Sequence, residues 1–328
     1  MALRRLLLLD FDGTITQHDT LASLVALAID TSSKTRTATT STITTTATTT
    51  VKKEKQALRA LWDEIVRDYV AAHRVHVEGY HPPQERRATL RQELAFLEST
   101  RDVERASVTR VGHAGFFAGL DAAALEGLGR EAVRLAAEEA NFSSSSTKGG
   151  YLEEEKREGA VRVRKGFGDF LNRQRIEGWD LAVVSVNWSG EFIKGVVQAG
   201  CPDGQGGWVR RVVANQIEYP NGLVEGPKEL CKEPLVTAGD KLRAMESLKE
   251  GLADEKVVYF GDSTTDLACL IEADLGVVMA DDAESKLLNT LKRVGREVPH
   301  VAEARKDSKL VWARDFDEVL RSNVIATI

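Results

Sequence analysis

A short apolar run near the start of the chain ends in two closely spaced acids. Leu6 to Leu9 are followed directly by Asp10-Phe11-Asp12-Gly13-Thr14. Side chains at positions i and i+2 of an extended backbone point the same way, so Asp10 and Asp12 can face one ligand at the end of a strand. Gly13 lets the backbone turn without a steric penalty. This pattern suits covalent phosphoryl transfer, in which one carboxylate attacks phosphorus and the other handles a proton.

Composition narrows the class of protein and of partner. The 328 residues are enough for about two domains, on a length prior of about 150 residues each. A formal net charge of -6 gives no electrostatic reason to expect nucleic acid or a membrane surface as the main partner. Cys201, Cys231 and Cys269 are widely spaced and form no C-x-x-C pair, so neither a disulfide framework nor a zinc site is indicated.

The chain shows no pattern typical of a targeting or membrane segment. The apolar stretch at its start is shorter than the core of a secretory signal, and Asp10 ends it. No stretch approaches the roughly 18 uninterrupted apolar residues of a membrane helix. We therefore expect a soluble, cytoplasmic protein. The sequence leaves its oligomeric state open.

Residues 31–51 form a low-complexity tract. Ser or Thr occupies 15 of its 21 positions, which leaves little apolar surface to hold a core. We expect a disordered loop here. A Thr-rich edge strand is the alternative, but the tract lacks the periodic burial that a strand would show.

Beyond this tract the apolar pattern is helical. Two runs show apolar residues at spacings of three and four: Leu58, Leu61, Trp62, Ile65, Tyr69 and Ala72, and then Leu90, Leu94 and Leu97. Pro82 and Pro83 separate these two helices. A third helix is expected from the N-cap candidate Asp121 to about residue 140, before a flexible loop at 143–150. Residues 17–160 are therefore predicted to be an all-helical cap inserted after the first strand.

From Val161 onward, strand and helix patterns alternate. Strands are expected at 181–186, 256–260 and 275–279, a hairpin at 212–218 and 223–225, and helices at 167–177, 189–199, 240–250 and from about 265. Such alternation predicts an α/β fold of three layers, with a mostly parallel, Rossmann-like sheet formed by residues 1–16 and 161–328. Ligands bind such sheets at the carboxyl ends of the strands.

Three further motifs fall at those strand ends. Ser185 lies near the end of an apolar run, where a lone serine is usually a turn former. Lys241 begins a predicted helix, and its ammonium beside Asp10 would keep that acid ionised. Gly261-Asp262-Ser263-Thr264-Thr265-Asp266 follows another apolar strand, and its two acids suit Mg²⁺, although a turn with a helix cap explains the same residues equally well.

Together, the four motifs in this order resemble the haloacid dehalogenase-like (HAD) hydrolases. The resemblance implies a HAD catalytic core and places a C1-type cap in the helical insert. It also implies that Asp10 is the nucleophile, forming an aspartyl-phosphate, and that Asp12 is the general acid/base.

The resemblance extends to ligands. It implies that Ser185 and Lys241 hold the phosphoryl group and that Asn187 lines the substrate pocket. It implies a Mg²⁺ site of four residues: Asp10, Asp12 through its backbone carbonyl, Asp262 and Asp266.

A narrower likeness involves the segments 185–191, 214–218 and 261–273. These are similar to the phosphatase part of plant thiamine-salvage enzymes and to fungal HAD-like proteins. The expected activity is therefore Mg²⁺-dependent hydrolysis of a small phosphorylated metabolite, with thiamine monophosphate as one candidate. Two alternatives stay open: a phosphomutase or phosphotransferase using the same residues, and an inactive binding protein on this scaffold.

Several other residues have a structural and a functional interpretation. His73 and His76 could share a metal ion, but no third ligand lies at a recognisable spacing. Trp62, Tyr69 and Trp188 could stack on an aromatic substrate, with helix packing the better explanation for the first two. Asp19 is explained by a helix start, and the resemblance implies that Asn215 lines the pocket.

Overall fold

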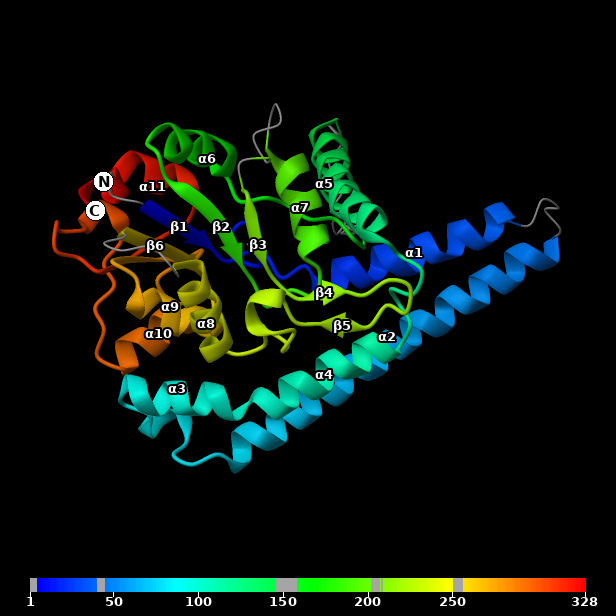
Figure 1. Ribbon diagram of the computed structural model, residues 1–328, viewed down its shortest axis with the longest axis horizontal. Coiled ribbons are helices and arrows are strands. Elements are labelled where there is room, and N and C mark those ends of the chain that lie inside the picture. The colour runs from blue at the N-terminus through cyan, green and yellow to red at the C-terminus, as the bar shows by residue number, and fades with distance from the viewer. Residues whose placement is uncertain (1–4, 40–44, 146–157, 202–206, 208, 250–255) are drawn as a thin grey trace.

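A computed structural model describes residues 5–39, 45–145, 158–201, 207, 209–249 and 256–328. Six parallel strands form the central sheet in the order β3-β2-β1-β6-β7-β8. Their bounds are β1 Arg5–Leu9, β2 Asp180–Val184, β3 Arg211–Val213, β6 Lys256–Gly261, β7 Leu275–Met279 and β8 Leu310–Ala313. The first strand in the sequence is thus central, with β2 and β6 on either side of it (Figure 1).

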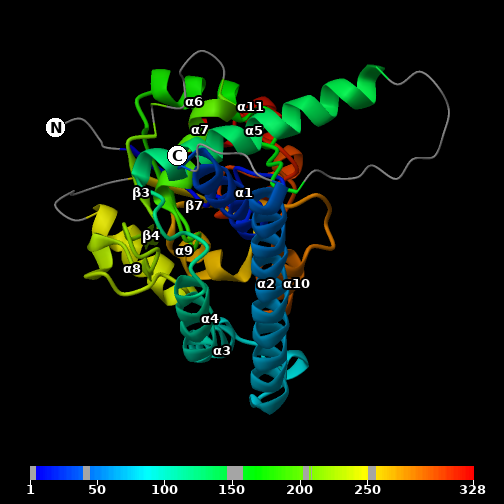
Figure 2. The same cartoon turned by 90° about the vertical axis from the view of Figure 1, so that its right-hand side faces the viewer.

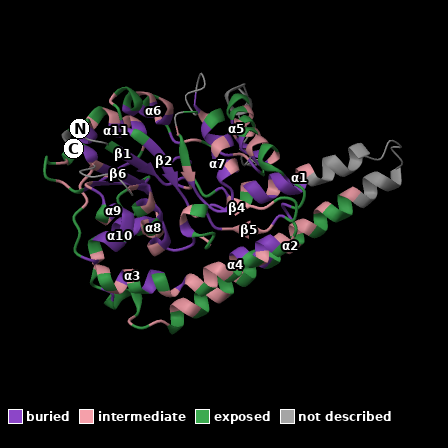
Figure 3. Ribbon diagram, viewed as in Figure 1, coloured by how far each residue is buried: buried purple, intermediate pink, exposed green. Residues whose placement is uncertain are grey.

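Alternate residues of the strands enter two different cores. Leu7 and Leu9 of β1 pack in one apolar cluster, whereas Leu6 and Leu8 pack in the other. The first cluster includes residues of three helices: α6 Phe167–Ile176, α7 Gly190–Gly200 and α11 Phe316–Ser322. The second includes residues of α8 Ala238–Lys249, α9 Leu267–Glu272 and α10 Lys286–Arg293. Helices therefore cover both faces of a buried sheet, and the predicted three-layer α/β fold is confirmed (Figure 3).

The described residues between β1 and α6 are mainly helical. They form α1 Leu21–Thr39, α2 Thr45–Gly79, α3 Leu90–Ser99, α4 Arg101–His113 and α5 Ala122–Ser145, with a 3₁₀ turn at Gln84–Arg86. The long helix α2 lies beside α1 and α4 (Figures 1 and 2). Asp121 caps α5 as predicted, since its Oδ1 accepts a hydrogen bond from the Ala124 amide at 2.8 Å. The domain boundaries at 16 and 160 stay a prediction.

The Ser/Thr-rich tract 31–51 is not a loop in its described part, so that prediction was wrong. Residues 31–39 continue α1 and residues 45–51 begin α2, while 40–44 lie outside the described residues. Ser and Thr cost only a few tenths of a kcal/mol each in a helix. Adding residues to an existing helix is far easier than starting one, so packed segments on either side can propagate into a polar tract.

Other elements also differ from the predictions. Residues 143–145 belong to α5, and 146–150 lie outside the described residues. The predicted strand 212–218 is divided between β3 in the main sheet and β4 Gln216–Ile217, which pairs antiparallel with β5 Val224–Glu225. Asn215 causes the break, because its side chain bonds to the carbonyls of Val186 and Leu235 at 3.0 Å and turns the chain away.

In the described part of the chain, every helix is too short or too polar to cross a bilayer. All three cysteines are free, as expected.

Candidate active site

The carboxylate of Asp10 lies at the end of the central strand, beside a buried lysine. The Asp10 amide continues the ladder to β6, donating to the Phe260 carbonyl at 2.9 Å. Lys241 Nζ is 2.7 Å from Asp10 Oδ1 and 2.6 Å from Asp266 Oδ1, and all three side chains are buried. Burial lowers the pKa of Lys241, but Asp10 and Asp266 raise it further, so the net shift is upward and the ammonium stays charged. Lys241 thus meets the nucleophile candidate, as predicted.

Asp266 is fully engaged by protein groups. Its Oδ1 accepts hydrogen bonds from Lys241 and from the Tyr259 hydroxyl at 2.8 Å. Its Oδ2 accepts hydrogen bonds from the amides of Asp262 at 3.2 Å and Ser263 at 3.1 Å. Asp266 therefore fixes the loop that carries Asp262, and little of its carboxylate is left for a metal ion.

Asp10, Asp262 and Asp266 form an acidic cluster whose carboxylate oxygens lie within 4.8 Å of one another. Burial and the neighbouring acids raise the pKa of Asp10 well above its usual range and that of Asp262 to about 7. Crowded carboxylate oxygens fit a hard divalent cation, held chiefly by Asp10 and Asp262.

Asp12 is held by neighbours from two other segments. Its Oδ1 accepts hydrogen bonds from the Thr20 amide at 2.8 Å and the Thr20 hydroxyl at 2.7 Å, and its Oδ2 accepts one from Asn187 Nδ2 at 2.8 Å. Burial and the charge of Asp19 raise the Asp12 pKa to about 6, against the lowering by these hydrogen bonds. A carboxyl group with this pKa can exchange protons near neutral pH. Its carboxylate points to Thr20 and Asn187, so metal binding through its carbonyl stays a prediction.

Ser185 and Asn187 lie behind the acids at the end of β2. The Ser185 hydroxyl accepts a hydrogen bond from the Asn187 amide at 3.1 Å, and both side chains are fully buried. Asn215 supports this turn, since its amide donates to the Asn187 carbonyl at 3.2 Å. The described contacts therefore give Asn187 a role in orienting Asp12, while contact of Ser185 with a phosphoryl group stays a prediction.

A cavity of 440 Å³ opens above Asp10 and Asp12. Two helices of the insert form its far wall, each with residues at spacings of three and four. They contribute Trp62, Ile65, Val66 and Tyr69 from α2 and Glu104, Ser107, Val108 and Val111 from α4. Asp262, Ser263 and Trp188 complete the side nearer the sheet. A small molecule bound here would have its reacting end on the acids and the rest against the helices.

Among the tentative residues, Trp62, Tyr69, Trp188 and Asp19 all line this cavity. Trp62 and Trp188 also pack edge to face, with ring centroids 6.1 Å apart. They therefore combine helix packing with a place in the cavity wall.

His73 and His76 form no metal cluster in the described residues. His76 Nε2 pairs with the Ser99 hydroxyl at 2.8 Å, and His73 lies beside Tyr69. These contacts support their structural interpretation.

Thr20, Tyr259 and Glu104 are site residues that the sequence did not reveal. Thr20 precedes α1 and is a residue type common at helix caps, so its hydrogen bond to Asp12 could not be predicted. Tyr259 lies within an apolar strand, and nothing in the sequence distinguishes it from its neighbours there. Glu104 lies on α4, a helix that the sequence analysis did not predict.

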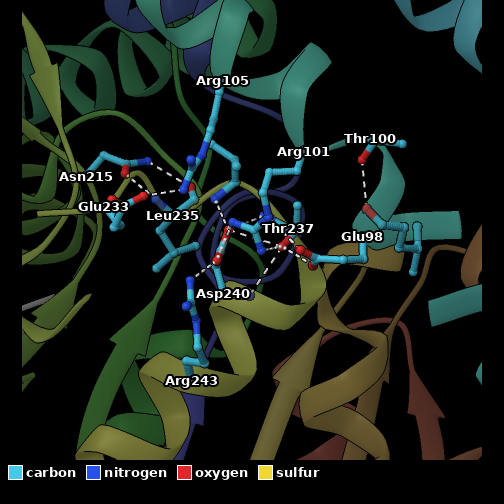
Figure 4. A network of polar contacts seen from close by, with 12 residues as sticks. Glu98, Thr100, Arg101, Arg105, Asn215, Glu233, Leu235, Thr237, Asp240 and Arg243 are labelled. Carbon is cyan, nitrogen blue, oxygen red and sulfur yellow. Dashed lines mark hydrogen bonds and ion pairs between the residues drawn. The ribbon is translucent and has the colours of Figure 1, made fainter. Parts of the chain in front are cut away.

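A polar network joins α4 to the start of α8 (Figure 4). Arg101 Nη1 lies 2.8 Å from Asp240 Oδ1, and Arg101 Nη2 donates to the Thr237 hydroxyl at 3.0 Å. Asp240 is fully buried and also accepts a hydrogen bond from the Thr237 amide at 3.0 Å. Since Asp240 precedes Lys241, this network ties the cavity wall to the helix that carries the site lysine.

No family model matches this chain. A curated relative, the mitochondrial bifunctional TH2 protein of Arabidopsis thaliana, is 24% identical over 290 residues. The match covers 87% of this chain but only 40% of that protein, so the chain spans less than half of its relative.

Solved structures are also similar to this chain. Cytosolic 5'-nucleotidase IIIB, solved with cytidine, has a TM-score of 0.51 at 13% identity, with 99% of this chain and 86% of that chain covered. A substrate-bound phosphoserine phosphatase has a TM-score of 0.44 at 14% identity, with 98% and 99% covered. At 13% identity, the likeness to the nucleotidase concerns the fold alone, and it agrees with the predicted α/β fold.

Proposed function

We propose that this chain is a phosphomonoesterase that hydrolyses a small phosphorylated metabolite through an aspartyl-phosphate on Asp10. The observation that carries the proposal is the placement of Asp10. It lies at the floor of a cavity, 2.7 Å from Lys241, beside Asp262 and next to an acid whose pKa is about 6. These are a nucleophile, a charge partner, a metal ligand and a proton carrier within one small volume.

In the first step, a carboxylate oxygen of Asp10 attacks phosphorus, and the bond from phosphorus to the leaving oxygen breaks. Asp12 gives its proton to that oxygen, so the product leaves as a neutral alcohol. Thr20 and Asn187 hold Asp12 in place for this transfer.

In the second step, water attacks phosphorus of the acyl-phosphate while Asp12 takes its proton. The bond between phosphorus and Asp10 breaks, which releases inorganic phosphate and restores both carboxyl groups. Lys241 favours the ionised form of Asp10, against the burial and the neighbouring acids that raise its pKa. A divalent cation, which we propose to be Mg²⁺ held by Asp10 and Asp262, would supply neutralising charge for the phosphoryl oxygens.

Thiamine monophosphate is the specific candidate substrate. The support is the similarity to the TH2 protein together with the size of the cavity and its aromatic wall. The relative is named as bifunctional and mitochondrial, and this chain matches 40% of it. The substrate and the cytoplasmic location of this chain are therefore both part of the proposal. A nucleic-acid or membrane partner is not part of it.

The test compares the wild-type chain with Asp10→Asn. With Mg²⁺, the wild type should release inorganic phosphate from p-nitrophenyl phosphate or thiamine monophosphate without any acceptor. Asp10→Asn should lose at least about a thousandfold in kcat, because the amide cannot attack phosphorus, while its thermal unfolding stays cooperative.

Three outcomes would contradict the proposal. Turnover in Asp10→Asn would exclude Asp10 as the nucleophile. Turnover only with an acceptor hydroxyl would favour a phosphotransferase. Failure on a broad panel of phosphate esters would favour a binding protein.

A further inference from the structure

The cavity wall carries two carboxylates besides those of the two acidic loops. Glu104 on α4 and Asp19 before α1 both line the cavity, and neither forms an ion pair with a Lys, Arg or His of the described residues. In that part of the chain no basic side chain lines the cavity at all. A phosphate ester entering it would therefore meet an acidic wall away from the phosphoryl site.

One oxygen of each carboxylate accepts a hydrogen bond from the protein. Glu104 Oε1 accepts a hydrogen bond from the Tyr69 hydroxyl at 2.9 Å, and Asp19 Oδ1 accepts one from the Leu21 amide at 2.9 Å. Among the described residues, no hydrogen bond reaches the second oxygen of either group. The two acids are thus oriented, and each keeps an oxygen for a ligand.

Aromatic rings lie beside these acids. Trp62 and Tyr69 project from the same side of α2, with Trp188 against Trp62. Aromatic faces and carboxylates together are the surroundings that stabilise an organic cation, since both attract positive charge and the rings replace its hydration shell. An anionic or strongly hydrated neutral group would lose water there without gaining a partner.

We propose that Glu104, held by Tyr69, selects substrates whose leaving group carries a positive charge on a flat ring. This inference rests on the proposed function and specifies its substrate class: phosphate monoesters of cationic heteroaromatic alcohols. Asp19 adds a second carboxylate to the cavity wall, close enough to raise the pKa of both Tyr69 and Asp12. Sugar phosphates and nucleotides, with neutral or anionic leaving groups, would be poor substrates.

The experiment uses two esters that differ in one atom. They are (1-methylpyridinium-3-yl)methyl phosphate and 3-methylbenzyl phosphate, in which carbon replaces the charged nitrogen. We expect Glu104→Gln to lower the ratio of kcat/KM for the cation to that for the neutral ester by about tenfold, because the substitution removes a carboxylate charge that attracts the cation. The difference in leaving-group chemistry cancels, because both enzymes use the same pair.

Two further variants separate selection from structure. Asp102→Asn removes an exposed carboxylate from the same helix and should leave the ratio unchanged. Tyr69→Phe keeps the ring but frees Glu104, and its ratio should fall between those of the wild type and Glu104→Gln. An unchanged ratio in Glu104→Gln, or an equal fall in Asp102→Asn, would overturn the proposal.

Binding of the two parent alcohols, measured by calorimetry, tests the same inference without catalysis. The wild type should bind the pyridinium alcohol more tightly than 3-methylbenzyl alcohol, and Glu104→Gln should not. Equal binding by the wild type would overturn this inference alone. Selective binding without hydrolysis of either ester would instead overturn the proposed function.

Discussion

Asp12 shows how neighbours decide what a single residue can do. Asp10 and Asp12 are two positions apart on one loop, yet Asp10 pairs with Lys241 while Asp12 bonds to Thr20 and Asn187. Burial and Asp266 raise the pKa of Asp10 well above its usual range, with Lys241 opposing the rise. Neutral donors limit the rise of the Asp12 pKa to about 6. The two acids therefore suit different steps of the proposed reaction.

Gly13 offers a test of how closely the two acidic loops approach. Its φ is +71°, and a Cβ at this position would lie 2.1 Å from Asp262 Oδ2. Gly13→Ala should therefore displace Asp262 and lower phosphatase activity at least about a hundredfold, besides a backbone cost of about 1–2 kcal/mol. Gly115→Ala is the matched control, since Gly115 has a φ of +76° with nothing within 4 Å of the added Cβ.

Urea unfolding and activity assays should separate the two variants. Both should lose similar free energy of unfolding, but only Gly13→Ala should lose activity. An active Gly13→Ala enzyme would mean that the loops need not approach this closely.

At the residue scale, the sequence was informative where chemistry and position coincide. Asp10, Lys241 and Asp262 could be singled out because each lies next to an apolar strand or a helix start. Glu104 and Thr20 could not, because an acid on a helix and a threonine before one are common on any surface. Their roles depend on which segments fold against them.

Among the elements, α4 links the cavity wall to the core through Arg101 and Asp240. Burial raises the Asp240 pKa, but the Val236 amide and the Arg101 guanidinium lower it more, so it lies below the usual 3.8. A carboxyl group with a depressed pKa in the folded state stabilises the fold above its unfolded pKa. That contribution is lost as the pH falls through 3.8 and below.

Arg101→Met should cost about 1.5–3 kcal/mol of unfolding free energy at pH 7, the usual value of hydrogen bonds to a charged group. Between about pH 5 and 3, the unfolding free energy of this variant should also fall less steeply than that of the wild type, because the folded pKa of Asp240 rises toward 3.8. Urea unfolding across this range measures both effects. Arg91→Met, at an exposed position of α3, is the control. Equal acid sensitivity of Arg101→Met and wild type would show that Asp240 does not depend on Arg101.

Element prediction succeeded where one signal dominated. The strands β1, β6 and β7 are apolar runs ended by an acid, a glycine or a turn, and their bounds agree with the prediction within a residue. By contrast, α4 follows α3 after one residue, Thr100, without a proline or glycine between them. The short edge strand β8 has four residues, too few for a clear alternation.

For the whole molecule, the parallel sheet explains why distant motifs meet. β1 pairs with β2 and β6 in register, so Asp10, Ser185 and Asp262 follow the carboxyl ends of three neighbouring strands. An all-parallel sheet places every strand's carboxyl end on the same side. The convergence could thus be predicted from strand order, whereas the shape of the cavity could not, because it depends on how α2 and α4 pack over that edge.

The acidic cluster joins the first strand to a loop some 250 positions later, so cation binding should be coupled to global stability. The cluster forms only in the folded state, and Mg²⁺ at a hundredfold excess over its Kd should add about 2.7 kcal/mol of unfolding free energy. Asp262→Asn should remove this gain and stabilise the metal-free protein, because it relieves repulsion with Asp10 and Asp266. Thermal unfolding with EDTA or Mg²⁺ measures both effects, with Asp63→Asn, an exposed acid on α2, as control. If Mg²⁺ stabilised Asp262→Asn as much as the wild type, the cation would bind elsewhere, and the two acidic loops would not form its site.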